Sequence, residues 1–66
     1  MAESVRKQMV RRCRLAIGRI KSTEETLCQV DGMSEGRSDT IKAMVPVILH
    51  ATEILTDLWE KMRANI

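Results

Sequence analysis

The chain has 66 residues and a mass of 7.5 kDa, with 44% hydrophobic, 30% charged and 2% aromatic residues and a formal net charge of +2. A single domain of this size buries only about 60% of its unfolded surface, so it usually needs disulfides, a metal or a partner chain. Two cysteines and one histidine form neither a disulfide framework nor a good zinc site. We therefore expect association with another chain, and we do not expect a self-sufficient enzyme.

Membrane spanning and secretion also conflict with the sequence. No apolar run approaches the roughly 20 residues that cross a bilayer, and no apolar segment of a signal peptide follows the first basic residues. Cys13 and Cys28 would lie about 22 Å apart on one helix, too far for a disulfide within the chain. We therefore expect an intracellular protein, cytoplasmic or nuclear, with reduced cysteines and no membrane partner.

Residues 4–30 predict the first helix. Ser4 can cap its beginning, and Gly32 can adopt the left-handed conformation just past its end. Apolar and small residues recur at alternating spacings of four and three, which is typical of an amphipathic helix with a heptad-like seam. These positions are Met9, Cys13, Ala16, Ile20, Thr23, Leu27 and Val30.

Residues 31–38 form the only segment that is typical of a loop, and residues 39–65 predict a second helix. Ser38, Asp39 and Thr40 all offer capping side chains. Pro46 removes a backbone donor and clashes with the preceding turn inside a helix. The second helix therefore either kinks at Pro46 or begins there, with proline as its first residue. A length matching that of the first helix favours the continuous, kinked form.

The apolar residues of the second helix cover nearly half of its circumference, more than one antiparallel helix can bury. We therefore predict an all-α, antiparallel two-helix hairpin that associates, most simply as a homodimeric four-helix bundle. A heteromeric helical partner satisfies the same requirement, and the chain is equally compatible with the N-terminal assembly domain of a larger protein. The expected interface residues are Ile20, Leu27, Val47, Ile54, Leu55, Leu58 and Trp59.

The charge distribution suggests an alternative function. Residues 1–22 contain seven basic residues and one acidic residue, whereas residues 23–66 contain four basic and eight acidic ones. Lys7, Arg11 and Arg14 share one solvent-facing line of the first helix, and such a line could contact the phosphates of RNA or DNA. In size and predicted architecture the hairpin is similar to the plasmid RNA-binding dimer ROP, with which it shares no functional motif. The sequence predicts no catalytic residue, cofactor or metal.

Overall fold

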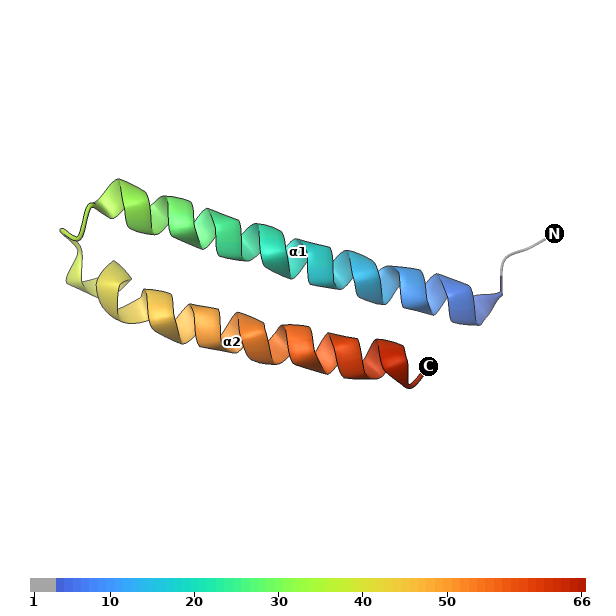
Figure 1. Cartoon of the computed structure of the whole chain (residues 1–66). Coiled ribbons are helices and arrows are strands. Elements are labelled where there is room, and N and C mark those ends of the chain that lie inside the picture. Colours follow the sequence, from blue (N-terminus) through green and yellow to red (C-terminus); the bar gives the residue numbers. More distant parts are fainter. Residues whose placement is uncertain (1–3) are drawn as a thin grey trace.

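The computed structural model describes residues 4–66, which form two antiparallel helices side by side (Figure 1). Helix α1 spans Val5–Ser34 and helix α2 spans Asp39–Ala64, and residues 4–66 include no strand. The prediction of an all-α helical hairpin is therefore confirmed.

Both helices begin at a capping serine. The Ser4 hydroxyl accepts a hydrogen bond from the Lys7 amide at 3.3 Å, and the Ser38 hydroxyl accepts one from the Ile41 amide at 3.2 Å. Each hydroxyl satisfies one of the backbone donors that have no partner in the first turn of a helix. Of the three capping side chains expected for α2, Ser38 is the one that is used.

The end of α1 differs from the prediction. The helix continues four residues past position 30, and the connection is residues 35–38 rather than 31–38. Gly32 lies inside the helix, while Glu35 and Gly36 adopt the left-handed conformation with φ of 51° and 73°. A helical glycine costs only about 1 kcal/mol relative to alanine, so Gly32 does not end the helix. The reversal occurs where Gly36 tolerates a positive φ.

Pro46 lies inside α2, which is one helix from Asp39 to Ala64. Of the two alternatives for this residue, the continuous helix is observed, and a start at Pro46 is wrong. The proline nitrogen cannot donate to the Lys42 carbonyl, so one hydrogen bond of the helix is missing. The Ser38 cap holds the preceding turns in helical conformation.

The hairpin is a single layer with little interior. Its principal extents are 55 × 20 × 10 Å and its radius of gyration is 15.9 Å, against about 10.8 Å for a compact chain of this length. Its accessible surface is 5415 Å², whereas a compact monomer of this mass exposes about 4,250 Å². Within residues 4–66 only Cys13, Ile17 and Thr52 are buried. The hairpin is therefore one layer of two helices, whereas most stable domains pack two or three layers around a core.

Candidate self-association surface

The contact between α1 and α2 is a narrow seam of buried and half-buried side chains. From α1 it takes Val10, Cys13, Ile17, Ile20, Glu24 and Leu27, and from α2 it takes Ile41, Val45, Ile48, Thr52, Thr56, Trp59 and Arg63. The seam of α1 is rotated by about one residue from the predicted one, so Met9, Thr23 and Val30 are exposed. Cys13 is buried as expected, and Cys28 is exposed.

A polar pair occupies the middle of this seam. The Thr52 hydroxyl lies 2.7 Å from a carboxylate oxygen of Glu24 and 2.9 Å from the Leu49 carbonyl oxygen, so both oxygens can accept its single proton. Thr52 is only 7% exposed, which makes it the sole buried residue of α2. The seam is therefore polar at its centre, and a carboxylate takes a position that a stand-alone hairpin would fill with an aliphatic side chain.

A residue that neighbours a seam residue in the sequence lies on one of the two faces of the hairpin, and its order relative to the seam residue decides which face. Each residue turns the helix by about 100°, so the residue before a seam position lies on one side and the residue after it on the other. Because the two helices are antiparallel, the residues that follow seam positions lie on the same face of the hairpin in both helices, and the residues that precede them lie on the opposite face. Lys21, Glu53 and Asp57 each follow a seam residue, and the three line one depression between α1 and α2.

Six of the seven residues that precede seam positions on α2 are apolar, and the exception is Thr40 at its start. Met44 precedes Val45, Ala51 precedes Thr52, and Leu58 precedes Trp59. With their neighbours on the same side they form the outer strip, defined as Met44, Val47, Ala51, Ile54, Leu55, Leu58 and Met62. Six members, all except Ala51, are between 45% and 58% exposed. The strip runs along most of α2 and is a continuous apolar face without a covering element within residues 4–66.

Helix α1 adds less apolar surface to the same face. Its residues that precede seam positions are Met9, Arg12, Ala16, Arg19, Thr23 and Thr26. Met9 is 44% exposed, and Ala16 is half-buried. Two arginines and two threonines interrupt this line, so the apolar surface of the face comes mainly from α2.

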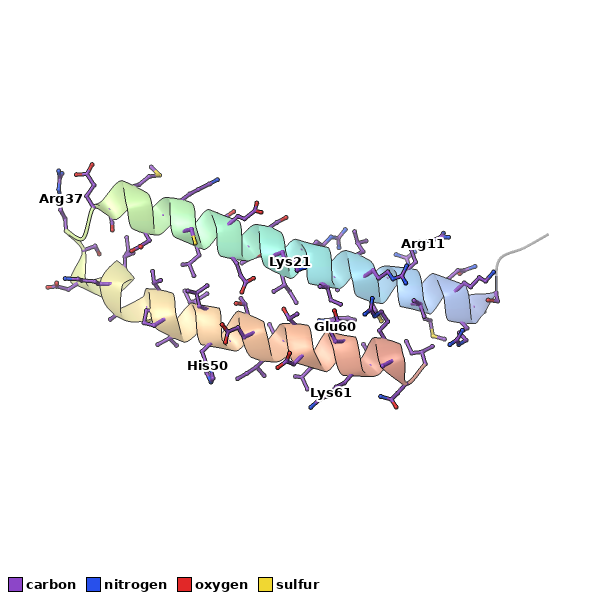
Figure 2. All side chains as sticks on the ribbon, in the orientation of Figure 1. Arg11, Lys21, Arg37, His50, Glu60 and Lys61 are labelled. Carbon is purple, nitrogen blue, oxygen red and sulfur yellow. The ribbon has the colours of Figure 1, made fainter. Side chains whose placement is uncertain are left out.

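The opposite face is charged. The depression between Lys21 and Glu24 of α1 and Glu53, Thr56 and Asp57 of α2 has a volume of 170 Å³. In Figure 2 the labelled Lys21 and Glu60 lie along the inner edges of the two helices, whereas His50 and Lys61 project from the outer edge of α2. Acidic residues of α2 therefore lie close to a basic residue of α1 around Lys21.

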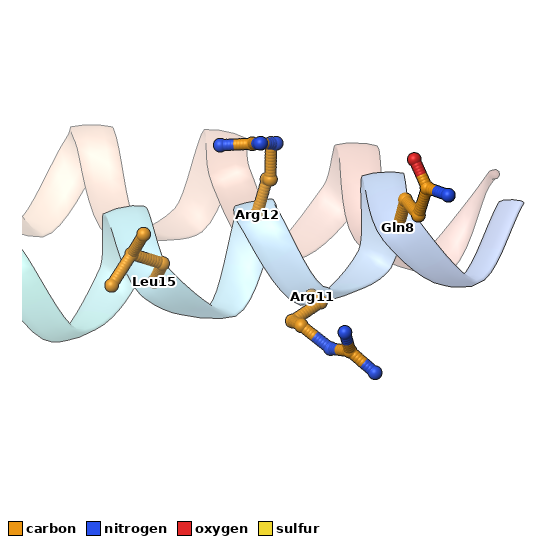
Figure 3. Close-up of a pocket in the computed structure, with 4 residues that line it drawn as sticks. All are labelled: Gln8, Arg11, Arg12 and Leu15. Carbon is orange, nitrogen blue, oxygen red and sulfur yellow. The ribbon is translucent and has the colours of Figure 1, made fainter. Parts of the chain in front are cut away.

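The predicted basic line lies where the sequence placed it. Lys7, Arg11 and Arg14 are exposed, and they line a depression of 280 Å³ together with Arg6 and Val10. A second depression of 450 Å³ lies around Gln8, Arg11, Arg12 and Leu15. Figure 3 shows that Arg11 and Arg12 point away from each other across this depression. The two guanidinium groups do not converge on one anion, so this depression is an open surface.

The predicted interface residues divide between two places. Val47, Ile54, Leu55 and Leu58 lie in the outer strip, while Ile20, Leu27 and Trp59 are half-buried in the seam. Three further members of the strip, Met44, Ala51 and Met62, were not among the predicted residues. Their helical spacing with Leu55 and Leu58 was the signal that could have identified them.

Residues 4–66 contain no group of three His, Cys, Asp or Glu side chains that could hold a metal ion. Neither α1 nor α2, which hold nearly all of the described residues, has a stretch apolar enough to cross a membrane. No protein-family model matches the chain, and no curated protein or solved structure is significantly similar to it.

Proposed function

We propose that the chain is a self-association module, in which two hairpins pack through their outer strips into a four-helix bundle. The observation that carries this proposal is the continuous exposure of the outer strip along α2. Soluble monomers rarely leave contiguous apolar patches of this kind in water. The role is non-enzymatic, as a small adaptor, regulator or assembly domain.

The surface area supports the same proposal. The hairpin's 5415 Å² of accessible surface exceeds that of a compact monomer of its mass by about 1,200 Å². One partner of a typical stable interface buries about 800 Å². The excess is therefore large enough for one such interface. A second hairpin would also provide the second layer that domains require.

Sedimentation equilibrium at several concentrations, in reducing buffer, tests the proposal directly. We expect a particle of twice the 7.5 kDa chain mass. A folded particle with the mass of one chain would contradict the proposal. An unfolded chain at all concentrations would also contradict it, because the missing layer would then belong to a different protein.

Nucleic-acid binding is the second candidate function, and the exposed line of Lys7, Arg11 and Arg14 favours it. Basic side chains on one line can neutralise successive phosphates, and such binding weakens steeply as salt rises. The test is a mobility shift with RNA and DNA at low salt. Replacing the three residues by alanine should abolish the shift without changing the particle mass.

A matched control variant distinguishes the effect of this basic line on nucleic-acid binding from the effect of net charge. Arg37, Lys42 and Lys61 are also exposed and lie outside α1, so their replacement by alanine removes the same number of charges elsewhere. This control variant should retain the shift if the basic line binds nucleic acid. The absence of a shift with the unmodified protein at low salt would reject the second candidate.

A further inference from the structure

The proposed dimer, on which this inference rests, can be built with twofold symmetry in two ways. In the parallel arrangement both loops lie at the same end, and α1 of each hairpin packs over α2 of the other. In the antiparallel arrangement the loops lie at opposite ends, and each helix packs over its own counterpart. Both arrangements are isologous and use the same face of the hairpin. The residues of that face and the charges at its ends distinguish them.

The outer strip is best covered by a second outer strip. The parallel arrangement would place it against the line of α1 that contains Arg12, Arg19 and Thr23. Burying unpaired guanidinium groups against aliphatic side chains is costly. The antiparallel arrangement places α2 against α2, so that Leu55 and Leu58 meet the apolar residues of the partner's strip. Met44 and Met62 lie equally far from Glu53 along α2, so each would lie opposite the other in the partner.

Charge at the two ends of the hairpin favours the same arrangement. The open end, residues 4–20 and 52–66, contains eight basic and three acidic residues, whereas the loop end, residues 21–51, contains three basic and five acidic ones. Parallel packing would bring two strongly positive ends together. Antiparallel packing places each positive end beside the negative loop end of the partner. Complementary potentials of this kind fix the register and orientation of an interface.

We infer that two copies of the chain associate antiparallel, with the α2 helices in direct contact across a twofold axis that crosses the outer strip at the level of Glu53. Each basic open end then lies beside the acidic loop of the partner, around Glu35 and Asp39. In this arrangement the outer strip of each hairpin is covered by the outer strip of a second copy of the chain.

Distances between spin labels test the orientation. Thr40 and Gln8 suit labelling because both are uncharged and exposed, so cysteine at either position preserves the charge pattern. Cys28→Ser removes the exposed native thiol, and Cys13, 3% exposed, stays in place. Thr40 lies thirteen residues from Glu53, about 20 Å along the helix.

The antiparallel dimer should place two Thr40→Cys labels about 40 Å apart along the bundle axis. Dimers mixed from Thr40→Cys and Gln8→Cys chains should bring their labels within about 20 Å, because the two sites then lie at the same level. The parallel dimer reverses both results: the Thr40 pair is close and the mixed pair is far apart. That reversal would overturn the inference while leaving self-association intact.

Salt provides an independent readout of the same inference. Raising the salt concentration screens the attraction between the unlike ends, so the dissociation constant of the antiparallel dimer should increase several-fold between low and high salt. A parallel dimer, with like ends together, would bind more tightly instead, and this outcome would overturn the inference. A particle with the mass of one chain under all conditions would reject self-association itself, and the arrangement with it.

Discussion

Along α2, the side that packs against α1 and the side that faces away carry different kinds of residue. The seam side includes Thr52, Thr56 and Arg63 among its aliphatic residues. The outward side includes Ile54, Leu55 and Leu58, each about half exposed. In a stand-alone protein the larger aliphatic side chains would face inward, because their burial provides most of the stabilisation.

This difference indicates that the seam and the outer strip have separate roles. The seam holds two helices side by side with a modest interior and a polar pair at its centre. Leu, Ile and Met side chains each contribute about 1.5–3 kcal/mol when they are fully buried, and most of those of α2 lie on the outer strip. Much of the stability available to the fold therefore depends on covering the outer strip.

The largest expected effect is the loss of the dimer on introducing a charge into the outer strip. Leu58→Asp should reduce the particle mass from twice 7.5 kDa to that of one chain, or unfold it, because the dimer would bury an unpaired carboxylate. Sedimentation equilibrium and circular dichroism measure the two outcomes.

Leu15→Asp is the matched control for this variant. Leu15 is 48% exposed and Leu58 is 54% exposed. Leu15, however, belongs to α1 and lies on the side of that helix opposite the seam, away from the outer strip of α2. Its replacement should leave mass and helicity unchanged. If both variants kept the mass of the unmodified protein, the distinction between the seam and the outer strip would have no functional meaning.

The next largest effect is expected on the stability of α2 itself, and it involves neither the seam nor the outer strip. Pro46 is exposed, and Pro46→Ala restores the missing backbone donor and relieves the clash inside the helix. We expect a gain of about 2 kcal/mol, since the helix penalty of proline is partly offset by its restriction of the unfolded chain. Urea unfolding measures the gain, and the particle mass should stay the same.

His50→Ala is the control for Pro46→Ala, because His50 is exposed and lies one turn further along α2. It changes only helix propensity, so its effect should stay below about 1 kcal/mol. Equal gains from the two variants would mean that Pro46 imposes no special strain on the helix.

Two helices, their antiparallel hairpin and the Ser4 cap followed from the sequence, because the apolar periodicity and the capping residues are local signals. For α2 the sequence offered three capping residues, of which the structure uses Ser38. The end of α1 did not follow. Gly32 and Gly36 are both candidates for a left-handed position, and a helix tolerates the first at a cost of about 1 kcal/mol. Which glycine ends the helix depends on how far α2 can pack along α1, which is a tertiary property.

Local apolar periodicity also made part of the candidate site predictable. The wide apolar arc of α2 predicted that Val47, Ile54, Leu55 and Leu58 are interface residues, and the structure exposes all four in the outer strip. Trp59 and Ile20 have equally apolar side chains but lie in the seam. Periodicity gives the angular width of an apolar surface, but the rotation of each helix about its axis decides which part of it faces the neighbour.

A smaller effect is expected for the polar pair of the seam. Thr52→Val removes the hydroxyl that lies 2.7 Å from the Glu24 carboxylate. The half-buried carboxylate then loses a partner, which should cost about 1–2 kcal/mol. Replacing both residues, as Glu24→Leu and Thr52→Val, should restore stability to or above that of the unmodified protein, because the seam becomes apolar. Urea unfolding of the single and double variants measures the difference, and a double variant weaker than Thr52→Val would contradict this assignment.

The smallest effect belongs to the turn, where two neighbouring residues should respond in opposite directions. Glu35 has φ 51° without being a glycine, and Gly36 has φ 73°. Glu35→Gly should stabilise the hairpin by about 1 kcal/mol, because it relieves the clash of a Cβ in the left-handed conformation. Gly36→Ala should destabilise it by a similar amount, about 1 kcal/mol, since it introduces that clash. Thermal unfolding measures both shifts. The particle mass should be unchanged in Gly36→Ala, because Gly36 is uncharged and lies outside the outer strip. Glu35→Gly also removes one charge of the acidic loop, so its effect is measured on unfolding alone.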